Sequence, residues 1–297
     1  PVIALLRQLR PDAQGPEQFG AADIGRPVWV FDAAGTNAEG DPVLNAEPKW
    51  YWPNGLTTLG KLLAEGLDVQ LGMQILRLID HRQVAATDGR TRGFTLLDIN
   101  GDAVGTADVV LLTPPAPQSA EIIEASTLDE ALKHTLLDEL GQVTYRRSIA
   151  VTLAYPRRPT VPWYALVNPD RQHPISWLAC EHDKHGHVPE DVGLIVAQMS
   201  HAFSTEHWDT ATRGIYGTGR AHLPPFVKLV EEQVNGLLQE DLGLPFWAYV
   251  HRWRYALPDG KASVERLNGT GSGIYFAGDV LSGQGRVHLA LESGMNV

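Results

Sequence analysis

The C-terminal stretch GIYFAGDVLSGQGRVHLALESGMNV, from Gly273 to Val297, constrains the fold of this chain more than any other segment. Its apolar run from Ile274 to Ala277 predicts a buried β-strand. Gly278 permits a tight exit from that strand, a glycine-rich loop follows, and a helix begins near Arg286. The order of strand, turn and helix is typical of α/β folds, which bind ligands at the carboxyl ends of their strands.

The residues after this strand suit a ligand that carries hydroxyl groups and negative charge. Asp279 stands at the strand's carboxyl end, where its carboxylate can accept hydrogen bonds from sugar-like hydroxyls. Gly283 and Gly285 would let a ligand approach the backbone closely. The amino end of the helix would present free N–H groups and a positive dipole to anionic oxygens. An ordinary strand, turn and helix without a ligand is the alternative that the residues leave open.

The rest of the chain alternates between strand and helix patterns. DVQLGMQILRLIDH predicts a strand, Asn100-Gly101 predicts the turn of a β-hairpin, and Pro114-Pro115 ends the apolar run from Val109 to Leu112. Helices are expected from about 118 to 125 and from about 128 to 140, and FVKLVEEQVNGLLQEDLG is amphipathic. The fold class predicted from these patterns is α/β with an additional α+β domain built on a mixed or antiparallel sheet.

The composition excludes some classes of function. The chain has 297 residues and a formal net charge of −11, which argues against nucleic acid as a partner because phosphate contacts need clustered cations. No apolar run approaches the length of a membrane span, so we expect no membrane partner. Its one cysteine, Cys180, cannot form an internal disulfide. We interpret it as a buried thiol and expect a reducing, cytoplasmic location.

Several motifs together resemble a known family. The terminal motif GIYFAGDVLSGQGRVHLALESG is similar to the C-terminal flavin motif of the flavin-containing amine oxidase superfamily. Five further stretches, in the same order along the chain, resemble the bacterial renalase-like branch: KWYWPNGLTTL, ADVVLLTPPAPQSAEII, SWLACEHDK, QMSHAFSTEHWD and VHRWRYALP. The resemblance covers most of the chain from Lys49 to Gly294.

The resemblance implies a flavoprotein fold with FAD as its cofactor. It assigns residues 70–117 and 251–297 to the FAD-binding domain, and residues 1–69 and 118–250 to the substrate domain. It implies two groups of site residues. The cofactor-binding group is Gly278, Asp279, Gly285, Arg286, Val287, Ile75 and Thr113, and the substrate-binding group is Trp52, Trp253 and Tyr255. Trp50 and Tyr51, beside Trp52, would lie near the substrate side as well.

The same resemblance implies an oxidoreductase that uses oxygen as its electron acceptor. A small, flat substrate would transfer a hydride to N5 of the flavin, and oxygen would reoxidise the flavin. An aberrant dihydronicotinamide isomer is the first candidate substrate, and a small amine is the alternative. No catalytic acid or base is assigned, because hydride loss that directly yields an aromatic cation requires none.

One expected element is missing from the sequence. Proteins of this kind begin with a strand, a G-x-G-x-x-G turn and a helix, which bind the dinucleotide pyrophosphate. The glycines of GTGSGIYF precede a strand instead of following one, so we interpret them as a turn. The chain is therefore expected to lack the N-terminal βαβ unit. A flavin-free fragment or binding module is the hypothesis from a different class.

A histidine-rich segment raises a third hypothesis. His182, His185 and His187 follow H-x2-H-x-H spacing, which a metal site could use. We expect a solvated loop here, because no second ligand cluster would complete a tetrahedral site. No G-x-S-x-G, H-E-x-x-H, Walker or C-x-x-C motif is present.

Overall fold

The fold is taken from a computed structural model, which describes residues 7–8, 11, 15–83, 93–217 and 222–297. The chain divides into two compact units. Unit 1 contains Gly66–Arg146 and Tyr255–Val297, and unit 2 contains Leu6–Glu65 and Arg147–Arg254. The boundaries at 146 and 254 fall inside two long strands, β9 (Thr144–Tyr155) and β14 (Trp247–Asp259). Each unit is described separately below.

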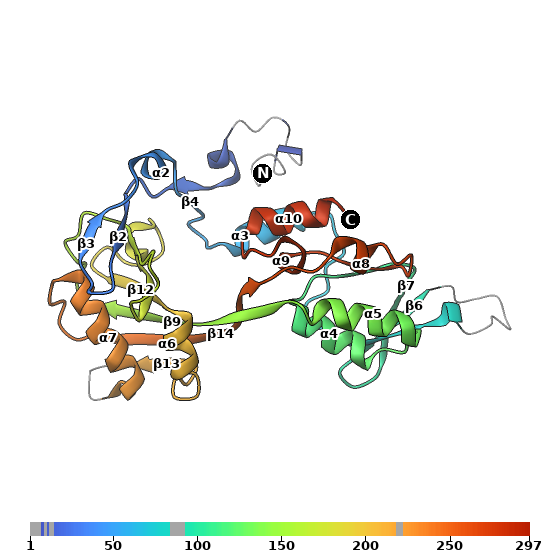
Figure 1. Cartoon of the computed structure of the whole chain (residues 1–297). Coiled ribbons are helices and arrows are strands. Elements are labelled where there is room, and N and C mark those ends of the chain that lie inside the picture. Colours follow the sequence, from blue (N-terminus) through green and yellow to red (C-terminus); the bar gives the residue numbers. More distant parts are fainter. Residues whose placement is uncertain (1–6, 9–10, 12–14, 84–92, 218–221) are drawn as a thin grey trace. The chain divides into compact units, whose positions relative to one another are not determined.

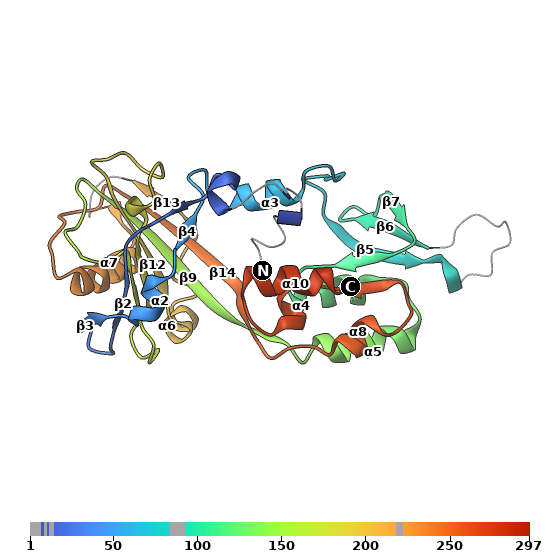
Figure 2. The same ribbon diagram turned by 90° about the horizontal axis from the view of Figure 1, so that it is seen from above.

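Unit 1 contains two small sheets and five helices among its described residues (Figures 1 and 2). One sheet is antiparallel, with β5 (Ile75–Asp80), β6 (Phe94–Asp98) and β7 (Ala103–Ala107) in that order. The other is a parallel pair, β8 (Val110–Leu112) and β15 (Ile274–Phe276). The helices are α4 (Ala116–Ala125), α5 (Glu130–Leu140), α8 (Val264–Asn268), α9 (Asp279–Ser282) and α10 (Val287–Met295).

The core of unit 1 joins segments that are far apart in the sequence. Apolar side chains from the strands pack with Ile123 of α4, Leu136 of α5 and Leu267 of α8. These side chains are fully buried, and α5 contacts α8 (Figure 2). Burying a side chain of this size contributes about 1.5–3 kcal/mol. The two parallel strands, whose paired residues are 164 positions apart in the chain, are thus held by a common core.

Unit 2 is built on an eight-stranded sheet. The strand order is β13, β14, β9, β12, β11, β10, β2 and β3. Besides β9 and β14, the members are β2 (Val28–Phe31), β3 (Asn37–Glu39), β10 (Ala165–Val167), β11 (Ile175–Cys180), β12 (Gly193–Met199) and β13 (Gly214–Gly217). A separate two-stranded ribbon pairs β1 (Ala22–Asp23) with β4 (Trp50–Tyr51). The helices of unit 2 are α2 (Pro42–Ala46), α3 (Thr57–Leu63), α6 (His201–Glu206) and α7 (Pro225–Leu238). Unit 2 also has two short 3-10 turns, η1 (Pro16–Phe19) and η3 (Glu181–Asp183).

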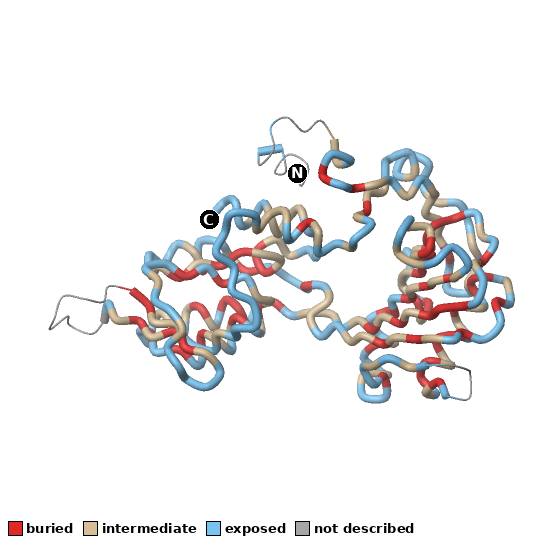
Figure 3. The backbone as a smooth tube through the Cα atoms, turned by 180° about the vertical axis from the view of Figure 1, so that it is seen from behind, coloured by how far each residue is buried: buried red, intermediate tan, exposed pale blue. Residues whose placement is uncertain are grey.

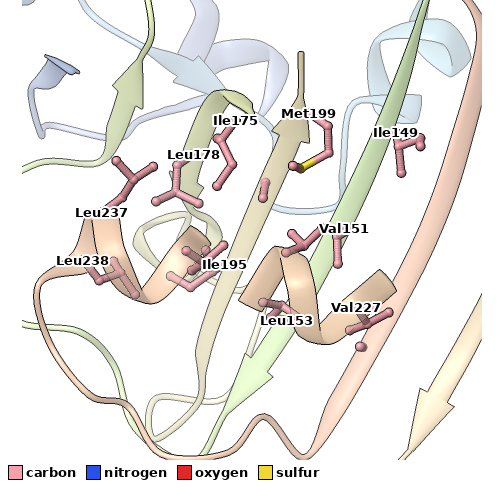
Figure 4. Close-up of a cluster of buried hydrophobic side chains, with 14 of the residues drawn as sticks. Ile149, Val151, Leu153, Ile175, Leu178, Ile195, Met199, Val227, Leu237 and Leu238 are labelled. Carbon is pink, nitrogen blue, oxygen red and sulfur yellow. The ribbon is translucent and has the colours of Figure 1, made fainter. Parts of the chain in front are cut away.

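One face of this sheet carries the main core of unit 2. Alternate residues of β9, among them Val151 and Leu153, belong to one buried cluster with Val227 and Leu237 of α7 (Figure 4). Figure 3 shows the buried residues of the unit concentrated along its strands, while loops are exposed. The opposite face bears a smaller apolar cluster around Ala165 and Ala179. Ile24, Val28 and Trp177 pack against this cluster on the second face.

The structure confirms two local expectations, the turn at Asn100-Gly101 and the burial of Cys180. The hairpin between β6 and β7 turns at Asn100-Gly101, where Gly101 has a φ of 85°. Cys180 is fully buried, as expected. In the described part of the chain, no helix is both long and apolar enough to cross a membrane.

The division into units departs from the predicted boundaries mainly at residues 118–146. The sequence patterns placed them with the segment up to 250, whereas they cluster with unit 1. The reason is the packing of α4 and α5, whose buried side chains Ile123, Leu136 and Leu140 join the core of unit 1. Amphipathic helices reveal that one face is buried but not which sheet buries it. The assignment of the units to cofactor and substrate stays a prediction.

The core of unit 2 gives a stability prediction. Leu153→Ala removes a fully buried side chain facing α7, and should lower the free energy of unfolding by about 2–5 kcal/mol. Urea denaturation followed by circular dichroism measures this. Leu44→Ala, at a side chain 64% exposed in the same unit, should change the free energy by less than about 0.5 kcal/mol. Equal effects of the two substitutions would contradict the assigned core.

Candidate functional site

The carboxyl ends of the two parallel strands in unit 1 lie side by side. Ile274 pairs with Val110 and Phe276 with Leu112, and the Ala277 N–H donates to the Leu112 carbonyl at 3.1 Å. Thr113 and Gly278 therefore emerge next to each other. Gly278 has φ 111° and ψ −158°, a conformation that essentially only glycine adopts. A side chain at this position would strain the turn whatever space surrounds it.

Asp279, the next residue, is held by a tyrosine from a distant segment. The Tyr145 hydroxyl donates to Asp279 Oδ1 at 2.8 Å and accepts a hydrogen bond from the Ala116 N–H at 3.3 Å. Burial, and then the hydrogen bond to the Asp279 carboxylate, raise the pKa of Tyr145 well above its usual value, so the phenol remains a donor. No described residue hydrogen-bonds the second carboxylate oxygen of Asp279. That oxygen is available to a ligand hydroxyl.

Helix α10 is tied to the same turn through Ser293, near the carboxyl end of the helix. The Gly278 N–H donates to Ser293 Oγ at 2.7 Å, and the Ser293 hydroxyl in turn donates to the Ala290 carbonyl at 2.8 Å. Arg286 occupies the N-cap position of the helix in an extended conformation, and its side chain makes no capping hydrogen bond. Among the described residues, the N–H groups of Val287 and His288 have no hydrogen-bond acceptor. Such free N–H groups and the helix dipole create a positive site at the amino end.

The glycine-rich loop between the turn and α10 corrects one expectation. Gly283 and Gly285 were expected to admit a ligand, but the close approaches that the structure shows are to the chain itself. A Cβ at Gly283 would lie 2.9 Å from Lys261 Cβ, and one at Gly285 would lie 2.5 Å from Leu257 Cδ2. Packing against the end of β14 explains both glycines. A contact between Gly285 and a cofactor stays a prediction.

The other predicted cofactor residue in unit 1 lies elsewhere. Ile75 begins β5, in the three-stranded antiparallel sheet, and packs against the core of the unit. Within the described residues, β5 is not hydrogen-bonded to β8 or β15. The structure thus brings Thr113, Gly278 and Asp279 together, and among the described residues it does not join Ile75 to them. Tyr145 is the site residue that sequence reasoning missed, because a tyrosine opening a strand matches no motif.

Unit 2 contains a separate aromatic pocket of about 370 Å³. This volume falls within the usual range for sites that bind small molecules. Trp52, a predicted substrate residue, lines the pocket, and its Nε1–H donates to the Phe19 carbonyl at 3.0 Å. The lining residues are Ile24, Val28, Lys49, Trp50, Tyr51, Trp52, Leu56, Tyr164, Trp177, Lys184 and His187.

The two remaining predicted substrate residues, on β14, do not line this pocket. Trp253, in unit 2, is 52% exposed, and its ring lies 4.3 Å from that of His251. Tyr255 falls in unit 1, where its ring meets Tyr145 edge-on at 5.6 Å. The pocket instead includes Tyr164 and Trp177, which the sequence analysis did not assign to a binding site.

The three histidines do not form the solvated loop that was expected. His185 is exposed, but His182 is 4% exposed and its Nδ1 lies 3.1 Å from the Leu194 N–H. His187 Nε2 lies 3.1 Å from the Trp52 carbonyl, which can only accept, so Nε2 carries a proton. The rings of His182 and His187 are therefore held by backbone groups of unit 2.

A different trio, Cys180, His182 and Asp183, places its possible metal-ligand atoms within 4.8 Å of one another. The donor chemistry is unsuited to a metal. Burial raises the pKa of the Cys180 thiol, so the thiol stays protonated. Both oxygens of Asp183 accept from the Arg26 guanidinium at 2.7 and 2.6 Å. These groups already satisfy one another as a buried polar network.

No family model matches the chain. Similar solved structures include a protein described as a protoporphyrinogen oxidase from Exiguobacterium sp. 255-15, with 20% identity and a TM-score of 0.55. They also include putrescine oxidase bound to putrescine, at 16% identity and a TM-score of 0.56. A third is cyclohexylamine oxidase from Brevibacterium oxydans IH-35A, at 15% and 0.55. The matches cover 83, 84 and 85% of this chain and 51, 52 and 53% of those chains, respectively.

These likenesses define the class of fold. The chain has a mixed α/β fold, with mixed and antiparallel sheets, that resembles the folds of flavin amine oxidase proteins. It spans about half the length of the solved structures that it matches.

The Tyr145–Asp279 hydrogen bond gives a pH-dependent prediction. Tyr145→Phe should lower the free energy of unfolding by about 1 kcal/mol at pH 7, since a partly exposed hydrogen bond to a carboxylate is lost. Because the folded pKa of Tyr145 is raised, its stabilisation is complete below the unfolded pKa of about 10. It should decline as pH rises above that value, so the difference from wild type should shrink.

Urea denaturation at pH 7 and above pH 10 measures this change. Tyr275→Phe is the matched control, because Tyr275 lies half-buried in the same unit and no described residue hydrogen-bonds its hydroxyl. A loss in Tyr145→Phe no larger than in the control at pH 7 would contradict the assigned hydrogen bond.

Proposed function

We propose that this chain is part of an FAD-dependent oxidoreductase, and that unit 1 holds the ribityl and ring end of the cofactor. The observation that carries the proposal is the free carboxylate oxygen of Asp279 at the turn after β15, a turn that the open amino end of α10 follows in the chain. The fold likeness to flavin amine oxidase proteins supports it. FAD, when bound, supplies a hydride acceptor at N5 and passes two electrons on to oxygen.

The residues of unit 1 fit the chemistry of such a group. The unbonded oxygen of Asp279 would accept a hydrogen bond from a ribityl hydroxyl, while Tyr145 holds the other oxygen in place. The N–H groups of Val287 and His288 would face the N1/O2 edge of the ring and stabilise negative charge there. Arg286 and Gly285 lie just before them in the same loop. Thr113 and Ile75 are proposed to lie toward the adenosine end.

The remaining part of the cofactor needs a pyrophosphate-binding turn, which the sequence does not contain. We place that turn in an N-terminal βαβ unit like that of other proteins with this fold. The surface of the β8–β15 pair supports the idea. Leu111 is 46% exposed and Val109 is 56% exposed, although parallel strands are normally covered on both faces. A βαβ unit packed there would bury these side chains.

The proposed substrate is a small, flat molecule that loses a hydride. An isomer of dihydronicotinamide fits, because hydride loss leaves an aromatic cation without any proton transfer. We propose that Trp52 in its pocket helps to position the ring, whereas substrate contacts of Trp253 and Tyr255 stay predictions from the sequence. Ring stacking contributes about 0.5–1.5 kcal/mol beyond burial. Molecular oxygen is the proposed electron acceptor, and a renalase-like activity is the finer assignment.

Two alternatives follow from specific observations. A flavin amine oxidase acting on a small amine is supported by the likeness to putrescine and cyclohexylamine oxidases. A flavin-free fragment or binding module is supported by the missing glycine-rich turn. The colour of the purified protein separates the flavin-free alternative from the proposed oxidoreductase and from the amine oxidase, because only the latter two would be yellow.

Titration with FAD tests the proposal. We expect flavin absorption and fluorescence changes on binding, with an affinity that falls about tenfold in Asp279→Asn, because one charged hydrogen-bond acceptor is lost. Asp138→Asn is the matched control, since Asp138 is an exposed carboxylate on α5 of the same unit. A chain that stays colourless with added FAD, or an Asp279→Asn protein that binds FAD like wild type, would contradict the proposal.

A further inference from the structure

The aromatic pocket of unit 2 is lined by lysine side chains as well as by aromatic rings. Three separate parts of the unit form it. The β4 ribbon and the residue after it bring Trp50, Tyr51 and Trp52, the sheet brings Trp177, and the segment around η3 brings Lys184. We propose that this pocket binds flat aromatic rings that carry an acidic group, and discriminates against rings that carry an amine.

The rings of the pocket are held in fixed positions. Tyr164 and Trp177 meet edge-on, with centroids 6.3 Å apart and planes at 70°. Tyr51 meets the His187 ring edge-on at 5.7 Å and 89°, and His187 in turn donates to the Trp52 carbonyl. Tyr51 and Tyr164 are buried, whereas the indole of Trp177 is only half-buried. Such a preorganised apolar lining favours a flat ring.

The Lys184 ammonium already occupies the ring face of Tyr164, the position that a ligand amine would use. Aromatic pockets attract cations to the faces of their rings. Here the Lys184 ammonium lies 5.7 Å from the centroid of Tyr164. It is fixed there by Glu181, whose two oxygens accept from Lys184 Nζ at 2.7 and 2.8 Å. A second ammonium in the pocket would meet this resident positive charge.

The balance of charge around the pocket is positive. Its lining includes Lys49, Lys184 and His187 but no carboxylate. The Glu181 carboxylate is bound by Lys184 and also faces His187 Nδ1 at 3.6 Å and the Tyr164 hydroxyl at 3.5 Å. Lys184 and Glu181 therefore cancel each other.

Lys49 supplies the uncompensated charge. Its Nζ donates only to the backbone carbonyls of Asn45 and Glu47 among the described residues, at 3.1 Å each. The neighbouring Asp23 carboxylate is bound to backbone N–H groups of Gly25 and Lys49 rather than to an ammonium. A carboxylate or phosphate on a ring in the pocket would give Lys49 an ionic partner.

The identification of this ligand with a substrate rests on the proposed oxidoreductase function, but the binding preference itself does not. If both hold, the substrate is an acidic ring compound, and the amine oxidase alternative is disfavoured. Binding to unit 2 without added FAD separates the two proposals. Loss of ring binding with intact FAD binding would overturn only the pocket, and the reverse result would overturn only the flavin site.

A matched pair of indoles tests the preference. Indole-3-propionate and tryptamine share one ring and differ in the sign of the side-chain charge. Isothermal titration of the full chain at low salt should show at least tenfold tighter binding of the acid. Trp177→Leu should weaken both ligands. Equal or tighter binding of tryptamine, or binding of neither ligand, would overturn the proposal.

Two lysine variants locate the cause. Lys49→Met should reduce the preference for the acid by at least threefold, whereas Lys61→Met, at an exposed lysine on α3, should leave it unchanged. Lys184→Met frees the Glu181 carboxylate and the face of Tyr164, so tryptamine should bind more tightly than to wild type. Circular dichroism confirms that each variant folds. A Lys49→Met protein that behaves like Lys61→Met, or no gain for tryptamine in Lys184→Met, would overturn the assignment.

Discussion

The parallel pairing of β8 with β15 is the constraint on which the candidate cofactor site depends. It places Thr113 beside Gly278, and this brings Asp279 within reach of Tyr145. The buried side chains of α4, α5 and α8 hold the pair from one side. The pair alone would be marginal, because two strands have few hydrogen bonds. Packing thus fixes a turn whose free polar groups can meet a ligand.

The two faces of the unit 2 sheet serve different purposes. One face is covered by α7, and Val151 and Leu153 form a buried cluster there with Val227 and Leu237. The other carries the small cluster of Ala165 and Ala179, with Trp177 at the pocket. Short side chains on that face leave room for the aromatic rings. The main core of unit 2 and the proposed binding pocket therefore lie on opposite faces of the same sheet.

The sequence predicted local features better than long-range partners. Gly278 and Asp279 were identifiable because a strand followed by a glycine turn is encoded in adjacent residues. Tyr145 was missed because its partner Asp279 lies 134 residues away and no pattern links them. The packing of α4 and α5 in the core of unit 1 was not predictable for a similar reason. The close approach of Lys261 to Gly283 and of Leu257 to Gly285 was not predictable, because a glycine indicates a close approach without identifying the group that approaches.

Hydrogen–deuterium exchange with and without FAD tests the central claim most directly. The claim is that the turn after β15 and the amino end of α10 form a cofactor surface. The account predicts slower exchange on adding FAD at the free N–H groups of Val287 and His288. Unchanged exchange there, with or without protection elsewhere in the chain, would contradict it.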